Sequence, residues 1–253
     1  MFKKILASVG IGSASVDTQL ESDYLVAGEP VRGKVVIKGG NTEQEIDKIN
    51  LFVMSEAVRE KDDRKYYEKI VLGSFVVGNS FTIAEGEHKE IDFEFQLPIH
   101  TPPTIGKTKV WIQTGLDVPN AIDPKDRDMV KVKPHHGMNT VIQALTNDLG
   151  FRLRKVEMEY SKRYRYVQEF EFIPIGGPFR GDLDELEAMF FIKESYIDIL
   201  LQIDRRAKGI GGLFAEALDI DESFIKVTLS NSDIKRGSFY VAEKLKETIS
   251  RYC

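Results

Sequence analysis

Cysteine and long apolar runs are almost absent from this chain of 253 residues. Its one cysteine is the last residue, Cys253, so no disulfide can form within the chain. No stretch approaches the roughly 18 consecutive apolar residues that a membrane-spanning helix requires. Because a convincing export signal is missing as well, these absences predict a protein of the reducing cytoplasm.

The residue patterns of common catalytic and metal sites are also missing. The four histidines fall in predicted turns and loops, at His88, His100, His135 and His136. No H-x-x-x-H pair and no G-x-S-x-G motif occurs. The glycine-rich segment KGIGG (208–212) is not followed by the Lys-Ser/Thr pair of a phosphate-binding loop, and we interpret it as a plain loop. We therefore predict no catalytic residues, no metal site and no cofactor.

Positive charge is in slight deficit, since the net charge is −5. This argues against a general nucleic-acid binder, which requires a basic surface. One basic and aromatic stretch, KRYRY (162–166), could stack on bases, but glutamates flank it on both sides and predict cross-strand ion pairs instead. The acidic run at 181–187 lacks the spacing of a calcium loop, so solvated acids or a partner surface remain the two interpretations.

Alternating apolar and polar residues are what the chain has in abundance. The stretch Tyr24–Gly40 opens with a Gly-Glu-Pro turn and continues as a strand. Val31, Val35 and Ile37 share one parity, and the charged residues between them share the other. This period of two predicts a sheet with one face on a core and one in water.

Similar alternation recurs along the chain and predicts a mainly β protein. The segments with this pattern are 15–25, 45–55, 66–72, 75–83, 87–97, 106–114, 129–133, 151–160, 166–173, 187–192, 196–204 and 224–229. Helical periodicity is confined to short segments at the N-terminus, near 140–149 and after 238. We predict two antiparallel β-sandwich domains with a few short helices, an N-terminal sandwich at 1–136 and a C-terminal sandwich with flanking helices at 137–253.

The first residues form a second kind of pattern. Phe2, Ile5, Leu6 and Val9 lie at i, i+3, i+4 and i+7, on one face of a two-turn helix. Such a helix can pack on the body of the protein, dock on a membrane surface or bind a partner, and a cleaved signal peptide is a further alternative. These four residues are candidate interaction residues.

Two arginines are unexpected in their strand. Arg152 and Arg154 share the parity of Val156 and Met158, the apolar side of the predicted strand. They lie either at its exposed start or toward a space between domains, where a carboxylate such as Asp204 or Asp182 would have to pair with them. We include both arginines among the candidate interaction residues.

The order of several motifs resembles a known family. The segments are GEPVRGKVVIKG (28–39), EIDKINLFVMSE (45–56), IDFEFQLPIHTPPTIGKTKVWIQTGLDV (91–118), GGPFRGDLDELE (176–187), LLQIDRR (200–206) and the opening MFKKILASVGIGSASVDT. Together they resemble the bacterial arrestin-like sporulation-control family, that of stage-zero sporulation protein M. The resemblance implies two arrestin-like β-sandwich domains and a cytoplasmic regulatory role in sporulation without catalysis.

This resemblance sets our functional expectations. We expect a non-catalytic adaptor that binds proteins of the sporulation or cell-division machinery, or a second copy of itself as a homodimer, and that does not bind nucleic acid. The alternative is a membrane-surface-associated sensor that docks through the N-terminal amphipathic segment at Phe2–Val9.

Overall fold

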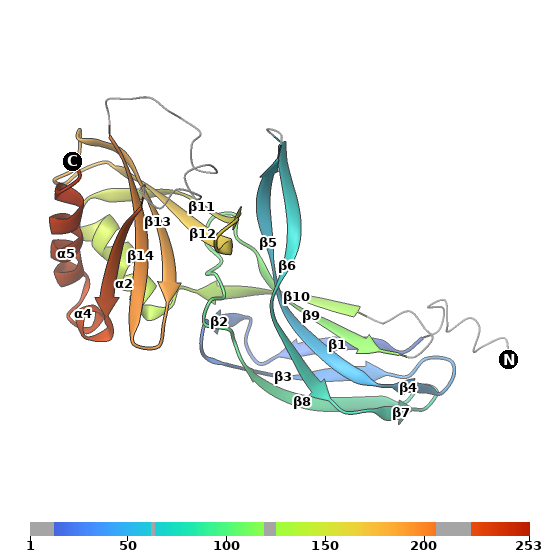
Figure 1. The fold of residues 1–253 in the computed structure, drawn as a ribbon. Coiled ribbons are helices and arrows are strands. Elements are labelled where there is room, and N and C mark those ends of the chain that lie inside the picture. Colours follow the sequence, from blue (N-terminus) through green and yellow to red (C-terminus); the bar gives the residue numbers. More distant parts are fainter. Residues whose placement is uncertain (1–12, 62–63, 119–124, 206–223) are drawn as a thin grey trace. The chain divides into compact units, whose positions relative to one another are not determined.

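A computed structural model describes residues 13–61, 64–118, 125–205 and 224–253 (Figure 1). The strands are β1 (Ser15–Leu20), β2 (Tyr24–Val26), β3 (Pro30–Lys38), β4 (Gln44–Ile46), β5 (Lys48–Lys61), β6 (Arg64–Gly78), β7 (Phe81–Ile83), β8 (His88–Gln96), β9 (Val110–Asp117), β10 (Lys125–Lys133), β11 (Phe151–Ser161), β12 (Arg165–Pro174), β13 (Leu183–Ile192), β14 (Tyr196–Arg205) and β15 (Ile225–Ser230). The helices are α2 (His136–Gln143), the π-helical turn η1 (Ala144–Asp148), α4 (Asn231–Lys235) and α5 (Ser238–Ser250).

The contacts between residues divide the chain into two units. Unit 1 comprises the described parts of Met1–Ser55, Lys69–Thr101 and Lys109–Lys133. Unit 2 comprises the described parts of Glu56–Glu68, Pro102–Thr108 and Pro134–Cys253. Two segments from the first half of the chain therefore belong to the second unit.

Unit 1 contains two larger sheets that pack on each other and the two-stranded antiparallel sheet β4-β7. One sheet has the antiparallel order β1-β3-β8. In the other, β9 pairs with β5 and β10, β6 pairs with β5, and β2 pairs in parallel with β10. The apolar residues of both sheets form one buried cluster, as expected where two inner faces interdigitate.

The alternation in the sequence explains this core. Val35 and Ile37 of β3 are fully buried. Residues of the opposite parity face solvent: Arg32 is exposed and pairs with the exposed Glu94 of β8 at 2.7 Å. The prediction of a half-buried strand at 31–37 is confirmed.

Unit 2 contains a five-stranded antiparallel sheet in the order β15-β14-β13-β12-β11. Figure 1 shows α2, α4 and α5 beside this sheet. Buried side chains of α2, η1, α4 and α5 share one cluster with buried side chains of all five strands. One face of the sheet is therefore covered by helices.

The mainly β fold with a few helices is confirmed. The structure adds that, among the described residues, the layer opposite the sheet of unit 2 is helical. The reason is that the apolar stripes of the two helical segments are long enough to cover the sheet: Val141 of α2 and Leu245 and Ile249 of α5 are fully buried.

Two local predictions were wrong. A strand break was expected at Gly73, but β6 continues through it, because the missing side chain lets the strand approach Pro98, whose Cγ would lie 2.8 Å from a Cβ there. The acidic run at 181–187 was expected to lie between strands, but β13 begins at Leu183; Asp182 and Asp184 are exposed, as the interpretation as solvated acids predicts. Leu183 and Leu186 are buried in the core of unit 2, so the acids between them belong to a strand.

Candidate functional site

The edge formed by β6 is the first candidate surface. In unit 1 this strand runs from Lys69 to Gly78 and, among the described strands, is paired only with β5. The ten residues KIVLGSFVVG contain one charge and no proline. Val71 is 58% exposed and Val76 is 61% exposed. A long apolar edge of this kind is a template on which another strand can pair.

Side chains on the inner face hold β6 in place. The ring of Phe75 stacks on that of Phe95 with 4.3 Å between centroids, and Ile70 is buried. The Leu72 carbonyl oxygen accepts a hydrogen bond from His100 Nε2 at 3.1 Å. Pro98 and His100 thus lie against the middle of β6, at Gly73 and Leu72, while Val71 and Val76 on either side of these contacts are exposed.

The other sheet of unit 1 protects its edges. The outer face of β8 carries the exposed acids Glu90, Asp92 and Glu94. On β1, the amide of Thr18 donates to Asp126 Oδ2 at 2.7 Å. Charges and side-chain caps of this kind are how proteins prevent unwanted strand pairing. Between Lys69 and Gly78, β6 has one such cap, from His100 to the Leu72 carbonyl, and only one charged residue.

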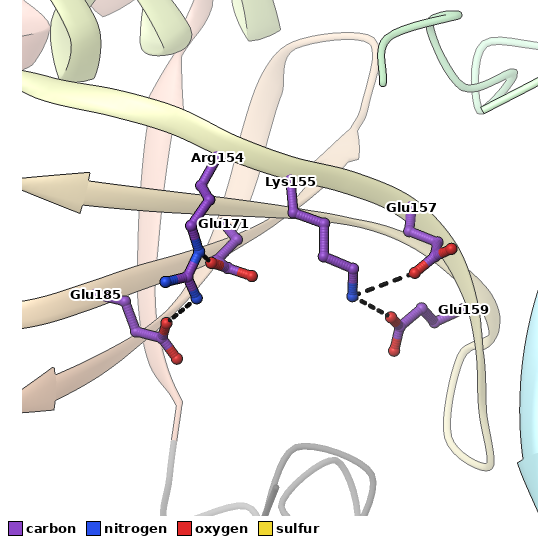
Figure 2. A network of polar contacts seen from close by, with 6 residues as sticks. All are labelled: Arg154, Lys155, Glu157, Glu159, Glu171 and Glu185. Carbon is purple, nitrogen blue, oxygen red and sulfur yellow. Dashed lines mark hydrogen bonds and ion pairs between the residues drawn. The ribbon is translucent and has the colours of Figure 1, made fainter. Parts of the chain in front are cut away.

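The second candidate surface is a polar cluster on β11, β12 and β13 (Figure 2). Arg154 forms ion pairs with Glu171 and with Glu185, the latter at 2.6 Å. Lys155 Nζ lies 3.2 Å from Glu157 Oε2 and 3.0 Å from Glu159 Oε1. We call these residues, with Glu169 and Glu187, the carboxylate cluster.

A β-bulge explains how Arg154 and Lys155, which are adjacent in sequence, can both belong to the carboxylate cluster. The register between β11 and β12 shifts between Leu153 and Lys155. The extra residue, Arg154, is therefore free of the strict alternation that would place it with Val156 in the core. Of the two alternatives for these arginines, the exposed start of the strand agrees with the exposure of Arg152 and Arg154. Asp204 and Asp182, the conceivable partners in the other alternative, are not the ion-pair partners of Arg154, which pairs with Glu171 and Glu185.

Burial, together with facing acids, raises the pKa values of two glutamates. Burial, followed by repulsion from Glu159, raises the pKa of Glu169 to about 8. Burial, followed by repulsion from Glu169 and Glu185, raises the pKa of Glu187 to about 9. For Lys155, burial lowers the pKa, but attraction and hydrogen bonding by Glu159 outweigh it and raise the pKa overall. The lysine is the cation that this cluster is built around.

These shifts predict how stability changes with pH. A carboxyl whose pKa is raised in the folded state stabilises the fold below its unfolded pKa, here 4.5, and loses that contribution as the pH rises toward 9. At pH 9 we expect Glu187→Gln to unfold at a higher urea concentration than the parent protein. Its free energy of unfolding should be larger by about 1–3 kcal/mol, after allowance for partial exposure.

The free energies of unfolding of Glu187→Gln and the parent protein should differ less at pH 5, where Glu187 is protonated in the folded state. Glu194→Gln, in the exposed turn after β13, is the matched control and should leave the pH dependence unchanged. If the stabilities of Glu187→Gln and the parent protein change equally with pH, the pKa of Glu187 is not raised in the folded state.

The structure locates only part of the predicted interaction set. Arg152 is exposed on β11, and Arg154 lies in the carboxylate cluster. Phe2, Ile5, Leu6 and Val9 lie outside the described residues, so the membrane-surface alternative stays a prediction. Neither the β6 edge nor the carboxylate cluster was found from sequence, since each depends on which strands pair.

Metal-binding groups and membrane-spanning helices are both absent from the described residues. Within residues 13–61, 64–118, 125–205 and 224–253, no group of three or more His, Cys, Asp or Glu side chains could hold a metal ion. In the same ranges, no helix has the length and apolar character needed to cross a membrane. The carboxylate cluster is not such a metal-binding group, and the ammonium group of Lys155 lies among its acids.

Comparison with known proteins gives a consistent result. A family model described as SpoOM protein matches residues 2–207. The chain is 40% identical to sporulation-control protein spo0M of Bacillus subtilis (strain 168) over 255 residues, which cover 99% of this chain and 98% of the relative. The crystal structure of Spo0M from Bacillus subtilis matches with a TM-score of 0.87 and 38% identity, over 96% of this chain and 100% of that chain.

Proposed function

Because the chain belongs to the Spo0M family, we propose that it is a cytoplasmic regulator of sporulation that acts by binding other proteins and not by catalysis. Its role is that of an arrestin-like adaptor. The observation that carries the proposal is the open edge of β6, with its exposed Val71 and Val76.

Strand addition is the binding mode that this edge favours. An extended segment of a partner would pair with backbone groups of β6 that do not bond to β5 or to His100, which supply affinity that is independent of partner sequence. The exposed valines would then contact alternate side chains of the incoming strand and supply selectivity. The single charge between Lys69 and Gly78 leaves little to repel such a segment.

A charged edge should abolish this function. We expect the double variant Val71→Lys, Val76→Lys to keep the parent melting temperature, because both side chains are exposed and surface changes shift stability by only about 0.5 kcal/mol. In a spore-forming host that lacks its own copy, it should fail to restore sporulation, with spore counts at least about tenfold below those with the parent gene.

Met129→Lys is the matched control. Met129 is 52% exposed and apolar, but it lies on β10, which is paired with β9 and β2. This variant should restore sporulation fully. If the double lysine variant restores it equally well, the β6 edge is not the binding surface. If sedimentation shows that the parent protein is a dimer and the double lysine variant is a monomer, the incoming strand comes from a second copy of the chain.

A further inference from the structure

The face of the unit 2 sheet that points away from the helices contains a cavity of about 440 Å³. It lies where the turn between β11 and β12 meets the ends of β13, β14 and β15. Strand register explains why its lining residues converge. Phe191 is directly opposite Asp198, and Leu200 is directly opposite Lys226, so all four share one face.

Aromatic and apolar side chains form one part of the cavity. The rings of Tyr164 and Phe191 are tilted against each other with 4.8 Å between centroids. Leu200 is buried beneath them, in a small cluster that also includes half-buried Phe224. This wall is separate from the helix-covered core and is partly open to solvent.

Basic side chains form the other part. Lys193, at the exposed turn after β13, lines the cavity together with Arg163 and Lys226. One carboxylate faces them: Asp198 pairs with Lys226 at 2.9 Å and accepts from Thr228 at 2.6 Å. Among the described residues that line this cavity, cations therefore outnumber carboxylates, although the whole chain has a net charge of −5.

We propose that this cavity binds a small organic anion in which a carboxylate is attached to an aromatic group. The aromatic group would pack between Tyr164 and Phe191 over Leu200, and the carboxylate would meet Lys193 at the rim. The mixture of an apolar wall with a few convergent polar groups, and the volume, are those of small-molecule sites. The inference does not depend on the β6 edge, which belongs to the other unit.

The test uses the full chain labelled with ¹⁵N and three probes of matched shape. N-acetyl-L-phenylalaninate should shift the amide signals of Tyr164, Phe191 and Leu200, with a dissociation constant on the order of 1 mM for a ligand of this size. N-acetyl-L-phenylalanine amide, which lacks the charge, should bind at least about tenfold more weakly. Acetate, which lacks the ring, should shift none of the three signals.

Reversing the charge at the rim gives a second measurement. Lys193→Glu should weaken binding of N-acetyl-L-phenylalaninate at least about tenfold and should strengthen binding of phenethylammonium by a similar factor. Because Lys193 is exposed, the variant should keep the parent melting temperature. Lys235→Glu, on the exposed surface of α4, is the matched control and should change neither affinity.

Two results would overturn the proposal. One is equal binding of the carboxylate and the amide, which would remove any role for the basic rim. The other is an absence of shifts at Tyr164, Phe191 and Leu200 in 10 mM probe, about tenfold above the expected dissociation constant. Either result would leave the proposed binding at β6 untouched, because that proposal has its own variants and its own measurement.

Discussion

Replacing Lys155 by Met should destabilise unit 2 by about 2–4 kcal/mol at neutral pH. The lysine contacts Glu157 and Glu159, and the side chain of Glu157 is only 5% exposed. Removing one partner of a buried pair leaves an uncompensated charge, which costs about 3–5 kcal/mol. We lower that figure because the side chain of Lys155 is itself 32% exposed.

The measurement is urea denaturation at pH 5, 7 and 9. The deficit should grow with pH, because more of the glutamates around the missing ammonium group become ionised. Lys107→Met is the matched control: its ammonium group lies 3.7 Å from the same Glu157, but its side chain is 72% exposed, so its removal should cost less than about 0.5 kcal/mol. Equal stability of the two variants at pH 9 would show that Lys155 does not hold the cluster together.

Leu245→Ala should cost about 2–5 kcal/mol, because it leaves a cavity beneath α5. Leu245 is fully buried in the cluster that joins the helices to the sheet of unit 2. All helices of the described ranges lie in unit 2, and the one tryptophan, Trp111, lies in unit 1. Helical circular dichroism therefore reports unit 2, and tryptophan fluorescence reports unit 1.

The helical signal should be lost at a lower denaturant concentration in Leu245→Ala than in the parent protein. Lys246→Ala, one residue along and on the exposed side of α5, should shift the transition by less than about 0.5 kcal/mol. A Leu245→Ala transition that coincides with that of Lys246→Ala would contradict the helical layer as a part of the core.

Strand alternation predicted much of the fold because burial on one face leaves a period of two in the sequence. The stretch at Tyr24–Gly40 is the clearest case: Val35 and Ile37 were expected inside, and both are fully buried. The stripe of α5 was equally readable, since Val241, Leu245 and Ile249 recur at helical spacing. Alternation does not show which element packs against the buried face of a strand. The helices that cover the unit 2 sheet were therefore identified only from the structure.

The candidate surfaces were less predictable, for a related reason. Arg154 was noticed as an oddity, but its partners Glu171 and Glu185 come from two other strands and depend on a bulge. The edge at β6 and the cavity beside Phe191 arise from which strands lie next to each other and which have no neighbour. A one-dimensional pattern records none of these relations.

The amino-acid sequence by itself determined that this is a mainly β protein of the Spo0M family, because periodic burial and the order of motifs are properties of the chain alone. The tertiary structure decided which of the described strands lie at sheet edges, which glutamates face each other, and where basic and aromatic side chains meet. These depend on register and topology, since residues distant in the chain become neighbours only when the backbone hydrogen bonds of the sheets form.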